Sequence, residues 1–256
     1  MGAVTDREKD FHNKAYADDS RRVVGKYYSI SRRSDEFYQQ TLDSCAGGKK
    51  VLEYGCGTGS YAFFLAQNGA TVTGIDISDV AVNLARQQAN RRRLDGLDFR
   101  VMNAEQLDFG DDSFDVICGT GILHHLQLDR AYAELSRTLK PEGRAVFVEP
   151  LGHNALINLY RKRTPELRTE DEHPLLMRDV RLAGDYFGSV KTRFFHLTSL
   201  AGVPLRRVPG FTVMLGFFEA IDRLLFMVLP FLKRYAWVVV LELAKPRKPA
   251  GGMSEH

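Results

Sequence analysis

Three closely spaced glycines follow a short apolar run in the segment Val51–Gly59. Gly55, Gly57 and Gly59 are two residues apart, and the acidic residue Glu53 stands just before them. Because glycine has no Cβ, a turn built from these residues lets the backbone lie directly against a ligand. A dinucleotide site requires Gly-x-Gly-x-x-Gly, whereas the third glycine comes one residue early here. The spacing therefore predicts a cofactor cradle and argues against an NAD site.

Short apolar runs alternate with longer mixed segments from about residue 49 to residue 150. This alternation is typical of repeated strand–helix units, so we predict an α/β fold with a parallel sheet. The expected strands are 50–54, 71–76, 97–103, 114–118 and 144–149. The expected helices between them are 60–67, 79–92 and 128–139.

Polar residues end the expected second and third strands. Asp76 ends the second, and Asn103-Ala104-Glu105 follow the third. Carboxyl ends of strands are where open α/β sheets bind ligands, so these residues and the glycine loop converge on one site. The separation between Gly59 and Asp76 is close to the spacing at which a carboxylate accepts two ribose hydroxyls. With Ile77 placed to pack on a purine face, the pattern predicts an adenosine derivative as ligand.

Composition limits the remaining classes. A length of 256 residues with 44% hydrophobic content fits one domain with additions or two small ones. A net charge of +3 does not by itself indicate a nucleic-acid partner. The cysteines Cys45, Cys56 and Cys118 form no Cys-x-x-Cys pair, and residues 1–10 lack the apolar core of a signal peptide. We therefore expect a cytoplasmic protein with reduced thiols, in which Cys56 and Cys118 are not catalytic.

These motifs resemble the class I S-adenosylmethionine-dependent methyltransferases, particularly the small-molecule group that includes the ubiquinone and menaquinone pathway enzymes. The resemblance covers about residues 49–150, and beyond the glycine loop it includes the segments 74–78, 103–107, 114–117, 123–125 and 139–144. It implies a Rossmann-like, seven-stranded, mostly parallel sheet with helices on both faces and an antiparallel last strand. It also implies S-adenosylmethionine as methyl donor and S-adenosylhomocysteine as product.

The resemblance further implies where the donor is held. Glu53 and the glycine backbone are expected near its methionine part, Asp76 on its ribose, and Asn103 to Glu105 near its adenine. The full set of expected cofactor-binding residues is Glu53, Gly55, Cys56, Gly57, Gly59, Asp76, Ile77, Asn103, Ala104, Glu105, Gly119 and Thr120.

Three histidines are candidates for proton transfer. His124 and His125 are adjacent, so their side chains point in different directions, and we expect one to face the cofactor and the other to be structural. His153 follows the fifth strand and is either an acceptor-pocket residue or a loop residue. With a hydroxyl or acidic-carbon acceptor such a histidine can remove the proton, whereas a carboxylate or free amine needs no strong base. Histidine and acid spacings give no metal-site pattern, so no metal is predicted.

Residues 1–45 are predicted to form a helical N-terminal extension. In the resembling family this extension closes over cofactor and acceptor, which makes Tyr27 and Tyr28 acceptor-pocket candidates; packing of both against the sheet is the alternative. Aromatic and basic residues interleave in Arg21–Arg33, as in nucleic-acid-binding segments. The fourth strand, however, leads into Cys118-Gly119-Thr120-Gly121, which lacks the signature of nucleic-acid amino methyltransferases. A lid is therefore preferred.

About forty residues separate the expected sixth strand, 187–197, from the seventh, 237–244. This insertion, about 203–234, is rich in apolar residues, but charges and Pro230 leave no run long enough to span a membrane. We expect an amphipathic cap over 211–234. It encloses a hydrophobic acceptor, rests peripherally on a membrane with Arg223, Lys233 and Arg234 near head groups, or packs on the sheet or a homodimer partner.

The sequence thus predicts four regions: a lid (1–45), a donor-binding core (46–150), a segment that completes the sheet (151–247) and a flexible tail (248–256). The predicted activity is methyl transfer by in-line displacement to a small, hydrophobic or lipid-like acceptor, achieved mainly by proximity and orientation. A cofactor-binding protein of this fold without methyl transfer, and an RNA methyltransferase, are the alternatives.

Overall fold

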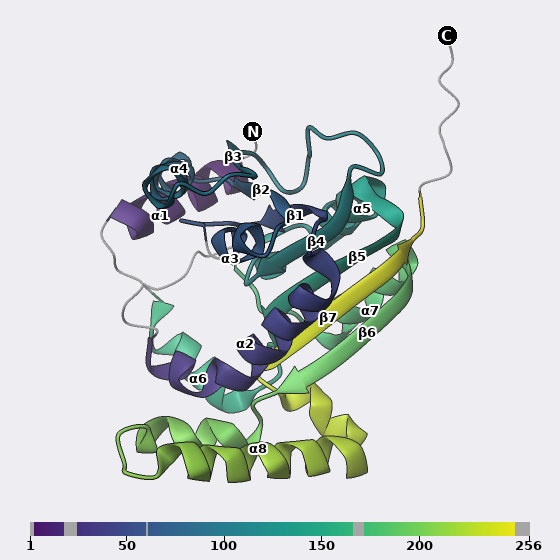
Figure 1. Cartoon of the computed structure of the whole chain (residues 1–256). Helices are drawn as coiled ribbons and strands as arrows, with labels where there is room; N and C mark the ends of the chain where they lie inside the picture. The colour runs from purple at the N-terminus through teal and green to yellow at the C-terminus, as the bar shows by residue number, and fades with distance from the viewer. Residues whose placement is uncertain (1–2, 18–24, 60, 166–171, 249–256) are drawn as a thin grey trace.

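A computed structural model describes residues 3–17, 25–59, 61–165 and 172–248. Within these residues one seven-stranded sheet has the order β3-β2-β1-β4-β5-β7-β6 (Figure 1). The strands are β1 (Lys50–Tyr54), β2 (Thr71–Asp76), β3 (Leu97–Val101), β4 (Phe114–Thr120), β5 (Leu139–Pro150), β6 (Phe187–Phe195) and β7 (Val238–Pro246). The first five strands are parallel, and β7 runs antiparallel to both β5 and β6. The expected α/β sheet with an antiparallel last strand is confirmed.

Helices cover both faces of the sheet (Figure 1). They are α1 (Ala3–Ala17), α2 (Gly25–Ala46), α3 (Ala62–Gln67), α4 (Asp79–Arg92), α5 (Leu128–Thr138), α6 (Ala155–Lys162), α7 (Met177–Tyr186) and α8 (Phe211–Val228). Short 3-10 helices are η2 (Leu123–His125), η4 (Thr198–Leu205) and η5 (Pro230–Tyr235). No helix among the described residues combines the length and apolar character needed to cross a bilayer.

Alternation along the strands divides the core into two layers. In β4, Val116 and Cys118 belong to the apolar layer under α2, α3 and α4, whereas Ile117 belongs to the layer under α5 and α7. Successive strand side chains point to opposite faces, so a strand that is apolar at every position is buried on both sides. The near-continuous apolar runs in the sequence have this origin.

Several strands begin or end a few residues away from the expected positions. β5 is expected from residue 144 but begins at Leu139, because residues 139–143 also belong to the strand. β3 ends at Val101, and β4 continues to Thr120, two residues beyond its expected end. α4 begins as predicted, because the Ser78 Oγ accepts a hydrogen bond of 3.1 Å from the Ala81 amide.

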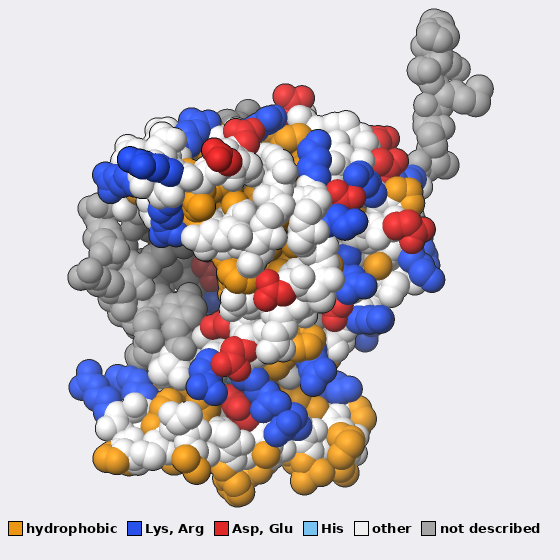
Figure 2. Space-filling model, in the orientation of Figure 1, with side chains coloured by type: hydrophobic (Ala, Val, Ile, Leu, Met, Phe, Trp, Pro, Cys, Tyr) orange, Lys and Arg blue, Asp and Glu red, His pale blue; other side chains and the backbone are white. Residues whose placement is uncertain are grey.

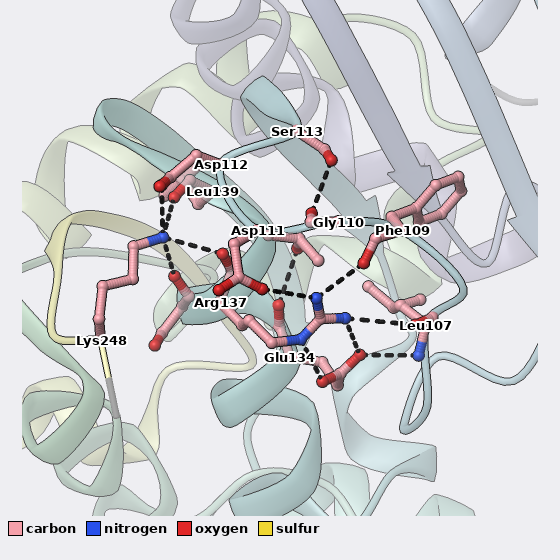
Figure 3. A network of polar contacts seen from close by, with 12 residues as sticks. Leu107, Phe109, Gly110, Asp111, Asp112, Ser113, Glu134, Arg137, Leu139 and Lys248 are labelled. Carbon is pink, nitrogen blue, oxygen red and sulfur yellow. Dashed lines mark hydrogen bonds and ion pairs between the residues drawn. The ribbon is translucent and has the colours of Figure 1, made fainter. Parts of the chain in front are cut away.

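A polar network fixes the loop between β3 and β4 against α5 (Figure 3). The Arg137 guanidinium donates to the carbonyls of Leu107 and Phe109 at 3.2 and 2.7 Å, and it pairs with Glu134 and Asp111. Burial alone raises the pKa of the Glu134 carboxyl, but hydrogen bonds from Arg137 and from the Leu107 amide outweigh burial and lower that pKa. The loop that continues from the third strand is thereby held in place.

Helix α8 belongs to the expected insertion between β6 and β7 and packs mainly on η4, with Phe226 also contacting Phe194 of β6 (Figure 1). Its inner face contributes Leu215 to a small apolar cluster with Ile30 of α2 and Leu200 of η4. Asp222, only 4% exposed, accepts hydrogen bonds of 2.6 Å from both the amide and the hydroxyl of Thr198. Apolar packing and a buried carboxylate together anchor this helix.

Candidate functional site

A cleft opens at the carboxyl ends of the parallel strands. It holds about 800 Å³ of empty space, part of which is open to solvent. Its walls come from α1, from the loops after β1 to β4, and from the turn at η2. The lining residues are Glu8, His12, Tyr16, Gly55, Ile75, Asp76, Ile77, Met102, Asn103, Ala104, Glu105, Thr120, Gly121, Ile122, His125 and Leu126.

The glycine loop has the conformation that the sequence predicts. Gly55, Gly57 and Gly59 have φ of 61°, 52° and 97°, in the region where side chains are strained. A Cβ at Gly57 would lie 2.7 Å from the Tyr16 hydroxyl oxygen, so the backbone here is approached closely from α1. A Cβ at Gly55 would meet Ile122 of the cleft wall at 3.0 Å, whereas one at Gly59 would meet Phe63 of α3 at 2.3 Å.

Asp76 lines the cleft and also fixes the cradle. Its Oδ2 accepts a hydrogen bond of 2.9 Å from the Gly57 amide, and its Oδ1 accepts one of 2.8 Å from the Ser78 amide. An ionised carboxylate has about four acceptor positions, so these two amides leave capacity for hydroxyl donors from a ligand. Ile77 lies beside it on the cleft wall.

Glu53 lies behind the glycine loop, and its expected place near the donor's methionine part stays a prediction. Its side chain is buried, with 1% exposure, and is not part of the cleft wall. Its two carboxylate oxygens accept hydrogen bonds of 2.9 Å from the amides of Tyr61 and Ala62, at the start of α3. A carboxylate at a helix N-terminus satisfies amides that have no partner within the helix. Glu53 thus shapes the loop from behind.

The segment after β3 reaches the cleft as expected. Asn103, Ala104 and Glu105 all line it. The Asn103 Oδ1 accepts a hydrogen bond of 2.9 Å from the Glu105 amide, which closes a local turn. The Glu105 Oε1 accepts one of 2.8 Å from the Gln127 amide. These contacts give the segment a fixed shape before any ligand binds.

Helix α1 forms one side of the cleft, a contribution that the sequence analysis did not assign to particular residues. Glu8, His12 and Tyr16 are four residues apart, so they share one helix face. Two contacts with the start of α4 anchor this helix. Asn13 Oδ1 accepts a hydrogen bond of 2.5 Å from the Ser78 hydroxyl, and Lys9 pairs with Asp79 at 3.0 Å. The i, i+4, i+8 spacing was the available sequence signal.

Tyr27 and Tyr28, the expected acceptor-pocket tyrosines, belong to α2, but their side chains lie outside the described residues.

The adjacent histidines diverge. His125 lines the cleft, and its Nδ1 lies 3.2 Å from Glu8 Oε2. His124 is 7% exposed, and its Nδ1 donates to Glu149 Oε2 at 2.8 Å. The other oxygen of Glu149 accepts from the amides of Ile122 and Leu123. His124 therefore braces the η2 turn, whereas His125 is presented to the cleft by that turn.

His153 lies away from the cleft wall. Its Nε2 accepts a hydrogen bond of 3.2 Å from the Met177 amide, at the start of α7. Its position after β5 agrees with the expectation that it follows the fifth strand, but its ring is engaged with the backbone of another helix.

The remaining expected cofactor residues lie behind the wall. Cys56, Gly57, Gly59 and Gly119 are buried and do not line the cleft. Burial, reinforced by the charges of Glu53 and Asp76, raises the pKa of the Cys56 thiol. A neutral buried thiol is not a nucleophile, which agrees with a packing role.

Metal-donor side chains also gather at this site. The donor atoms of Glu8, His12 and His125 lie within 4.8 Å of one another, as do those of His124, His125 and Glu172. The same groups make short contacts with each other: Glu8 Oε2 lies 3.3 Å from His12 Nε2, and Glu172 pairs with Arg161 at 2.8 Å. The expectation that no metal binds stays a prediction.

Part of the chain is similar to known methyltransferases. Residues 52–147 match the family model described as "Methyltransferase domain". The chain is 40% identical over 100 residues to the phthiotriol/phenolphthiotriol dimycocerosates methyltransferase of Mycobacterium tuberculosis, covering 38% of this chain and 36% of that protein. It is 32% identical over 124 residues to the fatty-acid O-methyltransferase of Mycolicibacterium smegmatis, covering 47% and 44% respectively. The matches span less than half the length of these relatives.

A solved structure extends the fold similarity to nearly the whole chain. The phospholethanolamine N-methyltransferase 2 of Haemonchus contortus aligns with a TM-score of 0.66 at 15% identity, covering 96% of this chain and 61% of that one. At this identity the alignment shows a shared fold. The family match is confined to residues 52–147, and the fold shared with this solved structure, including the sheet, extends over most of the rest of the chain.

Proposed function

We propose that this protein transfers a methyl group from S-adenosylmethionine to a small apolar acceptor. The observation that carries the proposal is the convergence of Gly55, Asp76 and Asn103–Glu105 on one cleft, within the residues that match the methyltransferase family model. The donor, when bound, supplies a methyl group that its sulfonium has already activated. The protein's task is therefore to bind, orient and shield the reactants.

The cleft residues fit such a donor. The spare acceptor positions of Asp76 suit two ribose hydroxyls, and the bare backbone at Gly55 admits close contact. Ile77 supplies an apolar surface for a purine, and Asn103 to Glu105 supply polar groups at its edge. Glu53 supports this arrangement through α3. In this proposal Cys56, Gly57, Gly59 and Gly119 act through the shape of the loops, because their positions are behind the wall.

In this proposal the protein accelerates methyl transfer mainly by positioning donor and acceptor relative to each other. Holding two reactants in line can lower a barrier by ~7–11 kcal/mol. Here α1 covers one side of the cleft with Glu8, His12 and Tyr16, and its contacts with Ser78 and Asp79 hold it there. A covered cleft also excludes water from the reacting groups.

His125 is the proposed base for acceptors that lose a proton. It lines the cleft, and the Glu8 carboxylate lies 3.2 Å from its Nδ1. The nearby carboxylate would stabilise the positive charge that the ring gains when it accepts a substrate proton. His124 is proposed as a positioning residue that acts through Glu149. A direct role for His153, and pocket roles for Tyr27 and Tyr28, stay predictions.

The acceptor is proposed to be hydrophobic or lipid-like. Met102, Ile122 and Leu126 add apolar surface to the cleft beside the donor residues. The names of the two relatives above describe acceptors of lipid character, which supports the same class for this chain. A cytoplasmic location, a homodimer and the four-region division stay predictions. Membrane contact through residues 211–234 does not follow from the cleft, because it depends on the surface of α8.

Turnover with defined acceptors tests the proposal. Purified protein is incubated with S-adenosylmethionine and either long-chain fatty acids and phenolic lipids or small polar acceptors, and both S-adenosylhomocysteine and methylated product are measured by mass spectrometry. We expect turnover with the apolar set. Turnover with polar acceptors alone contradicts the acceptor class. Donor binding without turnover across both sets favours the non-methylating alternative, and salt-dependent RNA binding favours the RNA methyltransferase.

A pair of histidine variants tests the proposed base. His125→Asn is expected to lower kcat by about 100-fold with acceptors that lose a proton, within the ~10²–10⁴-fold typical of general bases. His153→Asn is the matched control and is expected to retain most activity. Equal losses in both variants would contradict a special role for His125.

A further inference from the structure

The outward face of α8 is apolar. Val213, Phe217, Leu224, Met227 and Val228 have exposures of 81%, 64%, 54%, 71% and 62%. At about 100° per residue these five positions fall within roughly 100° of one another around the helix. Figure 2 shows hydrophobic side chains along the edge of the molecule where Figure 1 places α8. Phe231 of η5, 62% exposed, adds to the same apolar segment.

The acids of α8 lie on its inner side. Asp222 is 4% exposed and accepts hydrogen bonds from Thr198 and Ser199 of η4. Glu219 is paired with Arg33 of α2 at 3.3 Å. A surface helix normally turns its polar residues to solvent and its apolar residues inward. Here the exposed face is the apolar one, while the two carboxylates are used in internal contacts.

Basic residues surround this face. The segment 203–235 contains five basic residues and two acidic ones, and the two acids are the inward-facing Glu219 and Asp222. The basic residues are Arg206, Arg207, Arg223, Lys233 and Arg234. In Figure 2 a band of Lys and Arg side chains lies directly above the apolar edge. The outward charge of the segment is therefore positive.

We propose that this apolar face, defined as Val213, Phe217, Leu224, Met227, Val228 and Phe231, docks on the surface of an anionic lipid bilayer. Helix α8 lies in the plane of the interface, with its apolar side chains in the acyl region and its basic residues at the head groups. The mode of attachment is peripheral.

Charge distinguishes this occupant from a second copy of the chain. A two-fold symmetric contact brings the same surface of each copy together. Such a contact through α8 would place Arg223 and its basic neighbours near their own equivalents, without outward-facing acids in 203–235 to pair with them. An anionic membrane supplies both the apolar layer and the opposite charge.

Vesicle flotation of the full chain tests the proposal. We expect the protein to float with phosphatidylcholine vesicles that contain phosphatidylserine, more weakly with phosphatidylcholine alone, and less in high salt. The Phe217→Ser/Met227→Ser variant is expected to lose about 10-fold or more of its partitioning. Arg223→Gln is expected to lose about 5-fold in low salt. Val101→Ser, which changes an exposed apolar residue on β3 at the opposite edge of the sheet, is the control and should float normally.

Two results would overturn the inference. One is wild-type protein that stays unbound to anionic vesicles in low salt. The other is a wild-type dimer in analytical ultracentrifugation that Phe217→Ser/Met227→Ser converts to monomer, since the face would then be a self-contact. Flotation requires neither donor nor acceptor, and donor binding by calorimetry is expected to be unchanged in all variants. Failure of membrane docking is therefore distinguishable from failure of the proposed methyl transfer.

Discussion

Replacement of Glu53 by glutamine probes how the cradle is built. Both carboxylate oxygens accept amides at the start of α3, and the side chain is 1% exposed. Glutamine keeps one neutral acceptor and turns an NH₂ group toward the second amide. One hydrogen bond loses its charge, and one buried amide loses its acceptor, which together cost ~2–4 kcal/mol of unfolding free energy. For a chain of this size the expected fall in Tm is about 5–15 °C.

Thermal unfolding of the donor-free protein measures this loss. Glu142→Gln makes the same chemical change at an exposed position of β5 and is the matched control, with an expected change within ~0.5 kcal/mol. The reasoning is refuted if Glu53→Gln melts like the wild type without donor and loses only donor affinity. In that case the carboxylate would act on the ligand rather than on α3.

Two further predictions concern stability. Burial lowers the pKa of His196 to about 4, so the folded state keeps this ring neutral while the unfolded chain binds a proton near pH 6.5. The neutral ring therefore adds to the free energy of unfolding above about pH 6.5, and this contribution, ~3 kcal/mol in total, is lost as the pH falls toward 4. Urea unfolding across this pH range should show the fall in the wild type. The free energy of unfolding of His196→Gln should depend less on pH. Arg137→Met should cost ~2–4 kcal/mol because it frees two loop carbonyls and Glu134, whereas Lys140→Met, which breaks a more exposed pair with Asp115, should cost under ~1 kcal/mol. Equal losses in the two variants would contradict a special role for Arg137.

The parts of the fold that local patterns encode were predictable. The glycine spacing, the acid that ends β2 and the apolar runs depend on residues close in sequence. The cleft wall that α1 contributes could not be predicted in this way. Glu8 and His125 are far apart in the sequence and come together only through tertiary packing. Periodicity also does not say which face of an isolated amphipathic helix is inward. Glu219 and Asp222 interrupt the apolar run in the sequence, yet both turn toward the protein in the fold.

Local sequence also does not determine the orientation of the two acidic side chains beside the glycine loop. Asp76 and Glu53 both stand at the ends of strands beside the glycine loop. Asp76 faces the cleft, whereas Glu53 turns behind it to cap α3. Strand position places both acids near the site, but the exposure of each carboxylate depends on where the amides that it accepts lie in the fold: those of Glu53 are at the start of α3, and those of Asp76 are in the cleft loops.

The most direct test of the proposed donor site is calorimetric titration with S-adenosylmethionine and S-adenosylhomocysteine of the wild type, Asp76→Ala and the exposed control Asp112→Ala. Two hydrogen bonds to a charged acceptor contribute ~3–5 kcal/mol, so Asp76→Ala is expected to weaken both affinities by about 100-fold or more. Asp112→Ala should match the wild type. An Asp76→Ala variant that stays folded and binds both ligands as tightly as the wild type would contradict the assignment of this cleft as the donor site.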